Sequence, residues 1–85
     1  MDLNKYKANI KKFSDERDWD QFHDPKNLAM ALSAEIGELL DIFQWLTSEQ
    51  SNNLSDRDLS LAKEELGDIM IYLIRLCDKL DIDLE

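Results

Sequence analysis

The sequence has one cysteine, one proline, two glycines and no long apolar run, and these scarcities exclude several classes of protein. A single cysteine, Cys77, excludes an internal disulfide framework and a cysteine-rich zinc site. We interpret it as a small apolar core residue. No stretch reaches the ~18 apolar residues of a membrane span, and the N-terminus lacks the hydrophobic stretch of a signal peptide. We therefore expect a cytoplasmic protein that makes no membrane contact.

Basic side chains are also few. The 85 residues carry 10 Lys and Arg against 19 Asp and Glu, which gives a formal net charge of -9. Because nucleic-acid phosphates are held by clustered Lys and Arg, this balance argues against nucleic-acid binding. With so little glycine and proline and few β-branched residues, the composition predicts an all-α fold of one small domain, residues 1–85.

The spacing of apolar residues predicts three helices. The first covers residues 3–17, and an aromatic-rich break at 18–24 follows it. Asp24 and Pro25 mark the start of a second helix over 25–47, and the polar stretch 48–53 is expected to be a loop. Ser55 and Asp58 resemble a capping box for a third helix over 56–80. The two long helices should pack as an antiparallel hairpin.

The expected apolar stripes also predict self-association. The third helix should face its partner through a stripe listed here: Leu59, Ala62, Leu66, Ile69, Leu73, Leu76 and Leu80. Apolar side chains would remain on the opposite surface at Leu40, Phe43, Ile71 and Ile74. Because so small a domain buries only about 60–65 % of its unfolded surface, we expect a homodimer built as a helical bundle.

Two short acidic motifs lie within the long helices. Glu35-Ile36-Gly37-Glu38 and Glu65-Leu66-Gly67-Asp68 each place two carboxylates at i and i+3, which are neighbours on one helical face. The first acid of each motif interrupts an apolar stripe. We therefore expect Glu35 and Glu65 to point toward the opposite helix.

Carboxylates gathered in this way call for a cation. Two of them ~4 Å apart repel by about 4 kcal/mol at an effective dielectric near 20, and Lys63 and Arg75 fall off the stripes by helical spacing. Four carboxylates would suit Mg²⁺ or Mn²⁺. The alternative is a solvated acidic face, which an acidic chain often produces by chance. The doubling of the motif favours the metal site.

At these motifs the sequence resembles a known family. Glu35-x-x-Glu38 followed by Glu65-x-x-Asp68 is similar to the signature of the MazG-like all-α NTP pyrophosphohydrolases. Residues 17–28 (Arg-Asp-Trp-Asp-Gln-Phe-His-Asp-Pro-Lys-Asn-Leu) look like the dCTP pyrophosphatase branch, as do Phe-Gln-Trp at 43–45 and Ile-Tyr-Leu at 71–73. The resemblance covers about residues 13–76.

The resemblance implies a Mg²⁺-dependent enzyme that cleaves a nucleoside triphosphate between its α and β phosphates. The substrate class implied is dCTP or a modified dCTP, removed from the nucleotide pool as house-cleaning. Glu35, Glu38, Glu65 and Asp68 would hold the metal, which would also let a chain of net charge -9 bind a polyanion. Substrate contacts are expected from a second set of residues: Trp19, His23, Lys26, Asn27, Trp45 and Tyr72.

Other interpretations of these residues stay open. Trp45 and Tyr72 follow the acids at helical spacing, and core packing explains them equally well. His23 in a loop is often structural, and Lys26 in a first helical turn is often solvated. The family also continues into another helical segment with basic and amide residues near the phosphates. This sequence stops at residue 85, so the resemblance leads us to expect either that those contacts are supplied differently or that the form is shortened.

The family resemblance further implies a tetramer made of two dimers, with sites shared between subunits. The competing hypothesis is a non-catalytic helical oligomerisation or adaptor module, whose acids are solvated or bind a basic partner. The two hypotheses differ in one cheap observation. Mg²⁺ with a nucleotide should stabilise the enzyme against heat and leave the module unchanged.

Overall fold

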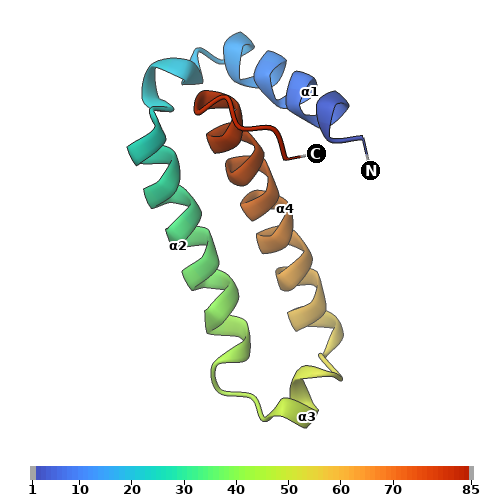
Figure 1. Cartoon of the computed structure of the whole chain (residues 1–85). Coiled ribbons are helices and arrows are strands. Elements are labelled where there is room, and N and C mark those ends of the chain that lie inside the picture. The colour runs from blue at the N-terminus through green and yellow to red at the C-terminus, as the bar shows by residue number, and fades with distance from the viewer. Residues whose placement is uncertain (1, 85) are drawn as a thin grey trace.

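The computed structural model describes residues 2–84, apart from the side chain of Asp20. Within that range the chain is all helix and turn with no strand, so the predicted all-α class is confirmed. The elements are α1 (Leu3–Glu16), the 3₁₀ turn η1 (Trp19–Phe22), α2 (Pro25–Phe43), α3 (Ser48–Ser51) and α4 (Asp56–Lys79). Figure 1 shows α2 and α4 as a long antiparallel hairpin, with α3 at its tip and α1 lying across its open end.

The predicted starts of the two long helices are confirmed. The Asp24 carboxylate accepts a 2.7 Å hydrogen bond from the Asn27 backbone N–H at the start of α2, where Pro25 is the first helical residue. The Ser55 hydroxyl accepts from the Asp58 backbone N–H at the start of α4. These side chains satisfy backbone donors that the first helical turn leaves unpaired.

The connection between the long helices differs from the prediction. α2 ends at Phe43 rather than near residue 47, and the expected loop contains the short helix α3. The cause is a capping box: the Thr47 side chain accepts from the Gln50 backbone N–H, and the Gln50 side chain accepts from the Thr47 backbone N–H. This reciprocal pair starts a new helical turn inside the polar stretch.

Burial on α4 follows a different stripe from the predicted one. Leu59, Leu66, Leu73 and Leu80, expected to face α2, are 40 % to 53 % exposed. The less exposed side chains are spaced alternately three and four residues apart: Ala62, Glu65, Ile69, Tyr72 and Leu76. The prediction was wrong at four of its seven positions because the helix meets α2 along a face that includes the acid Glu65.

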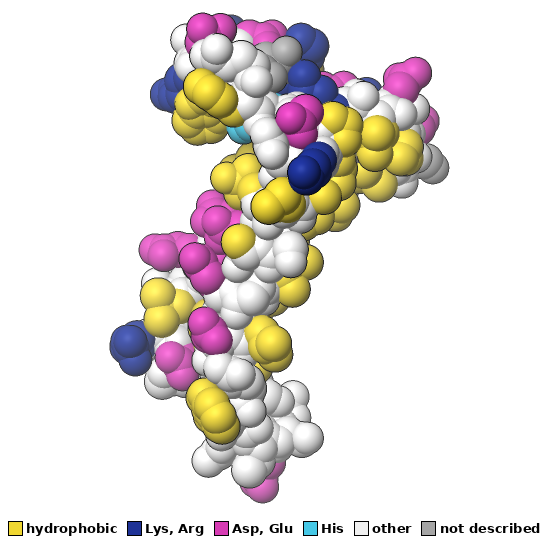
Figure 2. All heavy atoms as spheres, turned by 90° about the vertical axis from the view of Figure 1, so that its left-hand side faces the viewer, with side chains coloured by type: hydrophobic (Ala, Val, Ile, Leu, Met, Phe, Trp, Pro, Cys, Tyr) yellow, Lys and Arg dark blue, Asp and Glu magenta, His cyan; other side chains and the backbone are white. Residues whose placement is uncertain are grey.

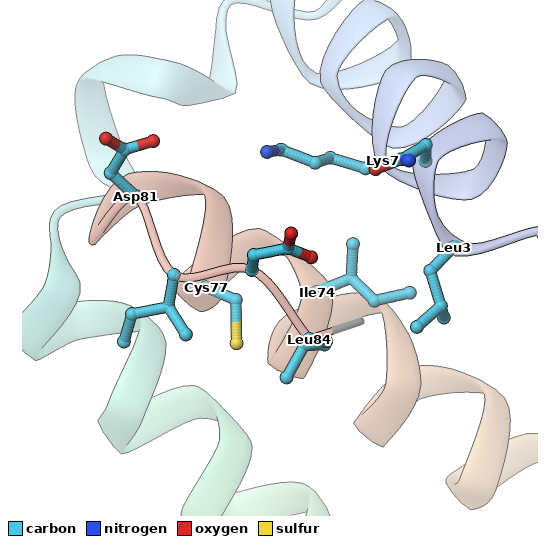
Figure 3. A pocket seen from close by; sticks show the side chains of 9 residues that line it. Leu3, Lys7, Ile74, Cys77, Asp81 and Leu84 are labelled. Carbon is cyan, nitrogen blue, oxygen red and sulfur yellow. The ribbon is translucent and has the colours of Figure 1, made fainter.

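The few buried apolar side chains are spread along the hairpin, and α1 packs against α4 near its C-terminal end. Leu28, Ala62 and Ile74 are the fully buried apolar side chains among the described residues. Ile74 was expected to face outward, but it is 4 % exposed because α1 packs against this end of α4. Figure 3 shows Ile74 and Cys77 of α4 lining, with Leu3 and Lys7 of α1, a cavity of about 250 Å³. Cys77, interpreted from the sequence as a core residue, is half-buried there.

Leu40 and Ile71, also expected to face outward, are exposed, and Phe43 is half-buried. Figure 2 shows acidic side chains gathered over the middle of the hairpin, with apolar side chains exposed above and below them. None of the helices formed by residues 2–84 is long and apolar enough to cross a membrane.

Candidate metal and nucleotide site

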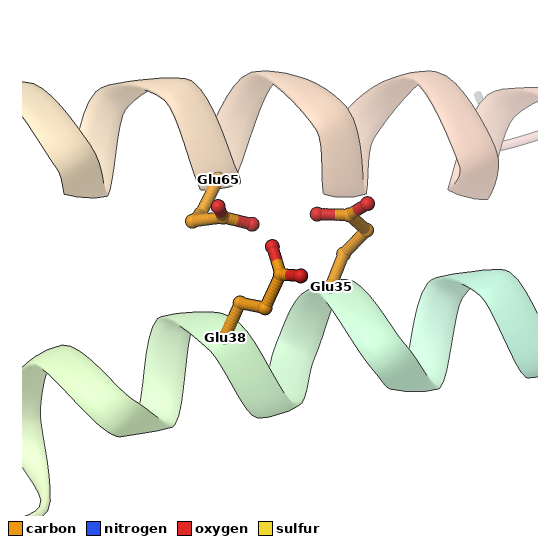
Figure 4. A group of neighbouring side chains, drawn as sticks. All are labelled: Glu35, Glu38 and Glu65. Atoms are coloured by element: carbon orange, nitrogen blue, oxygen red, sulfur yellow. The ribbon is translucent and has the colours of Figure 1, made fainter.

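Three carboxylates meet in the middle of the hairpin. Glu35 and Glu38 from α2 and Glu65 from α4 each offer an oxygen atom, and these atoms lie within 4.8 Å of one another. Figure 4 shows the side chains converging in the space between the helices. The prediction that Glu35 and Glu65 point toward the opposite helix is therefore confirmed.

The burial of two of these carboxylates is incompletely compensated. The Oε2 atoms of Glu35 and Glu65 are buried and have no hydrogen-bond partner. Leaving a buried acceptor unpaired costs the free energy of removing it from water, and the cost is larger for a charged group. Such atoms in a native fold call for an unseen partner, and carboxylate oxygens are the ligands that hard divalent cations prefer. The three carboxylates therefore fit a divalent cation.

The gathering of these acids also changes the pKa of Glu65. Protonated Glu65 can donate a hydrogen bond to Glu35, and this interaction, partial burial and the adjacent Glu38 carboxylate raise the pKa of Glu65 from its ordinary 4.5 to about 7. Where no cation is bound, a proton partly relieves the accumulated charge. A cation and a proton would thus compete for the same place in the hairpin.

Asp68, the fourth predicted ligand, lies outside this group. It lines a neighbouring cleft of about 500 Å³ together with Glu35. The walls of that cleft come from α1, η1, the segment before α2, the middle of α2 and α4, and they include Trp19, His23 and Tyr72. Glu35 therefore belongs both to the carboxylate group and to the cleft.

The aromatic wall of the cleft is held by ring contacts. The Phe13 and Trp19 rings meet edge to face with their centroids 5.1 Å apart, and the Trp19 and His23 rings are 5.9 Å apart. The Arg17 guanidinium lies 3.5 Å from the centre of the Phe13 ring. Asp18, with a φ of 58°, turns the chain between α1 and η1 so that Trp19 reaches the cleft.

Comparison with known proteins finds relatives and a similar solved structure. No protein-family model matches the chain. Over 74 residues the chain is 46 % identical to dCTP pyrophosphatase 1 of Bos taurus and 45 % identical to that of Homo sapiens. These matches cover 85 % of this chain and 44 % of each relative, so the chain spans less than half the length of the curated relatives that it matches.

A solved structure extends the comparison to the fold. The crystal structure of a pyrophosphatase from Archaeoglobus fulgidus matches with a TM-score of 0.89 and 37 % identity, over 98 % of this chain and 78 % of that one. The chain belongs to the MazG-like pyrophosphohydrolase family, in its dCTP pyrophosphatase branch. The family resemblance drawn from the sequence is thereby confirmed.

Three residues that the family resemblance suggested lie away from the cleft in the single chain. Lys26 is exposed in the first turn of α2. The Asn27 side chain donates hydrogen bonds to the Phe22 carbonyl and the Asp24 carboxylate, so it stabilises the start of α2. Trp45 follows the end of α2, near the hairpin tip, and is 85 % exposed. Their contact with substrate stays a prediction.

Arg75 lines the cleft, and the helical-spacing argument missed it. It is 2 % exposed, and its Nε donates to His23 Nδ1 at 3.4 Å. The argument placed Arg75 off the stripe because it used the exposed leucines as reference. One signal could have found it: Arg75 follows Asp68 by seven residues, so the two share a helical face.

A second, more open hollow of about 460 Å³ lies nearer the hairpin tip. Glu38 and Glu65 line it together with Asp41 and Asp58, and Arg57 contributes the one basic side chain of its lining. The carboxylate group thus lies between an aromatic cleft and a strongly acidic hollow. A negatively charged ligand would meet less repulsion from the side of the cleft.

Proposed function

We propose that this chain is a metal-dependent pyrophosphohydrolase that cleaves a deoxynucleoside triphosphate to the monophosphate and pyrophosphate. The observation that carries the proposal is that Glu35 belongs both to the group of three carboxylates and to the lining of the aromatic cleft. A nucleotide has two unlike halves, a planar base and a charged polyphosphate. A cleft with aromatic walls beside a cation site offers a matching place for each half.

In this proposal Glu35, Glu38 and Glu65 hold Mg²⁺, with Mn²⁺ as a substitute, and Asp68 extends the set into the cleft. When bound, the cation would neutralise phosphate charge and make a water molecule more acidic. The carboxylates supply the negative charge that keeps the cation in place. The unpaired Oε2 atoms of Glu35 and Glu65 support this role, because a cation would satisfy both.

The base would lie against Trp19 and Tyr72, with His23 at the same wall. Phe13 supports this arrangement by holding the Trp19 ring edge to face. The relatives named dCTP pyrophosphatase 1 favour dCTP or a modified dCTP as the substrate. Clearing such nucleotides from the deoxynucleotide pool would be a house-cleaning role.

We further propose that the chain works as a homo-oligomer, a dimer or a tetramer of two dimers. The leucine row, Leu59, Leu66, Leu73 and Leu80, recurs every seven residues along α4 and its C-cap, and the single chain leaves all four side chains exposed to water. An exposed tryptophan at position 45, distant from its own cleft, would contact substrate only across subunits. Lys26 would likewise depend on the assembly for any contact with phosphate.

The experiment that tests the activity is pyrophosphate release from canonical and 5-modified dNTPs, with Mg²⁺ and with EDTA. We expect release that requires Mg²⁺, is fastest for a cytosine nucleotide and is abolished by Glu38→Gln. Glu64→Gln, which changes an exposed acid next to Glu65, is the matched control and should keep the parent rate. Equal rates for Glu38→Gln and the parent would exclude the assigned metal role. No release from any dNTP would favour the non-catalytic helical module.

A further inference from the structure

Arg75 makes a long-range contact that the proposed reaction does not yet use. Its buried guanidinium donates from Nε to His23 Nδ1 at 3.4 Å, which links α4 to the segment before α2. From Nη1 it donates to the Asp78 carboxylate at 3.3 Å, and the other oxygen of Asp78 lies 3.4 Å from Lys7 Nζ. One charged chain of contacts therefore joins α1, α4 and the cleft wall.

This contact determines where His23 carries its proton. Arginine has five N–H donors and no acceptor, and it stays charged at any pH at which the protein is folded. The nitrogen that faces Arg75 Nε must therefore be the acceptor, so Nδ1 has no proton. A neutral imidazole then keeps its single proton on Nε2. The neighbouring Trp19 ring, 5.9 Å away, limits how the imidazole can turn.

Arg75 is one of two cations that pair with Asp78. Asp78 also pairs with Lys7, so the carboxylate has a second cation within reach. Burying a guanidinium is costly, and a buried ion pair is weak support for stability. The Nε–Nδ1 contact gives Arg75 an effect that Lys7 cannot supply, since it acts on a side chain of the cleft.

We propose that Arg75 is a positioning residue that holds His23 as a neutral ring with its proton on Nε2. His23 in this form can donate a hydrogen bond to an acceptor atom of a nucleobase, such as a carbonyl oxygen or a ring nitrogen. The proposal rests on the nucleotide function proposed above. It assigns Arg75, a residue of the cleft wall, an effect that passes through His23, and the test separates this effect from a direct contact with substrate.

The tautomer can be observed without any nucleotide. His23 is the one histidine of the chain, so the ¹⁵N signals of the imidazole need no assignment. At a pH above the ordinary imidazole range, we expect a pyridine-type Nδ1 and a pyrrole-type Nε2 in the whole chain. Arg75→Met should give the averaged signals of mixed tautomers. Arg75→Lys should restore part of the difference because an ammonium still donates, and Asp78→Asn should retain it. Mixed tautomers in the parent, or unchanged signals in a folded Arg75→Met chain, would overturn the proposal.

Nucleotide hydrolysis provides the second readout. Arg75→Met should raise KM about fivefold, as expected for one lost hydrogen bond, and leave kcat nearly unchanged. In a His23→Phe background the same substitution should have no further effect on KM. Lys63→Met, which removes an exposed cation from the same helix, is the control. An equal rise of KM in the His23→Phe background would mean that Arg75 acts independently of His23. If the parent hydrolyses no nucleotide, the proposed function fails, and the ¹⁵N spectrum still decides the proposal about Arg75.

Discussion

Glu35 on α2 and Glu65 on α4 face each other across the hairpin, and each buries one carboxylate oxygen that has no hydrogen-bond partner. The two helices thus meet at a place where like charges accumulate. Apolar contacts elsewhere along α2 and α4 hold the helices together. At the carboxylates themselves, the electrostatic free energy is unfavourable unless a cation or a proton is bound. Two predictions follow directly from this pair.

Without divalent cations, the stability of the fold should decrease as the pH rises from about 4.5 to about 7. Glu65 has a pKa of about 7 in the folded chain and an ordinary value of 4.5. Between these values the folded state keeps a proton that the unfolded state has released, so raising the pH favours unfolding. Above about pH 7 this contribution is lost and the curve should level off.

The measurement is thermal unfolding in EDTA over this pH interval. The chain has many other acidic groups, so the parent should be compared with Glu65→Gln, which replaces the titratable carboxyl group of residue 65 with a neutral amide. The difference in Tm between the two chains isolates the contribution of Glu65. A difference that does not change between pH 4.5 and pH 7 would contradict the assigned cause.

Mg²⁺ alone should stabilise the folded chain, and more strongly above pH 7 than at pH 5. A ligand at 100 times its dissociation constant adds about 2.7 kcal/mol, and for a small domain 1 kcal/mol raises Tm by about 4–8 °C. We expect Glu38→Gln to lose most of this shift and the exposed Glu64→Gln to retain it. A shift of equal size in both variants would indicate cation binding elsewhere on the acidic surface.

Asp81→Gly should stabilise the end of α4 by about 0.5–1 kcal/mol. Asp81 has a φ of 56°, and the hydrogen bonds from Asp81 N to Asp78 O and from Ile82 N to Cys77 O form the helix-ending pattern that favours glycine. Removing a carboxylate from a helix C-terminus adds to the gain. Urea unfolding should show a higher midpoint for Asp81→Gly and a lower one for Asp81→Ala, whose Cβ opposes this backbone conformation.

Leu66→Lys should dissociate the proposed oligomer without unfolding the hairpin. Leu66 is among the most exposed residues of the leucine row, so the single chain loses little when the residue becomes charged. In a paired row, by contrast, a buried lysine would be costly. Light scattering should show a lower mass for Leu66→Lys than for the parent, and Tyr6→Lys on the exposed side of α1 should retain the parent mass. A parent mass of one chain, about 10.0 kDa, would exclude the oligomer.

The sequence predicted the elements whose signals are local. Asp24 and Pro25 mark the start of α2, and Ser55 marks the start of α4, because the capping side chains act within three residues. The orientation of Glu35 and Glu65 was also predictable, since both interrupt an apolar pattern. Thr47 and Gln50 carried the same kind of local signal, but the polar composition around them suggested a loop.

The rest depended on how helices meet in space. Two heptad patterns compete on α4, and the one made of leucines is the more apolar. The face that packs against α2 instead includes Glu65 and Tyr72. Because these two residues are polar or amphipathic, their pattern looks less like a packing face than the row of leucines does. With the leucine row as the reference, Arg75 was not predicted as a site residue. Arg75 nevertheless shares a helical face with Asp68 and lines the same cleft. Nothing in the sequence pattern of the two long helices indicated where α1 packs, so the burial of Ile74 under α1 was not predicted.

The membership of Glu35 in both the carboxylate group and the cleft has a thermodynamic consequence. If the cation and the nucleotide share this side chain, each changes the free energy with which the other binds. Linkage requires the two effects to be equal: the factor by which Mg²⁺ tightens nucleotide binding is the factor by which the nucleotide tightens Mg²⁺ binding. In a cell with scarce free Mg²⁺, the concentration of the nucleotide would then help to set how much of the protein carries the metal.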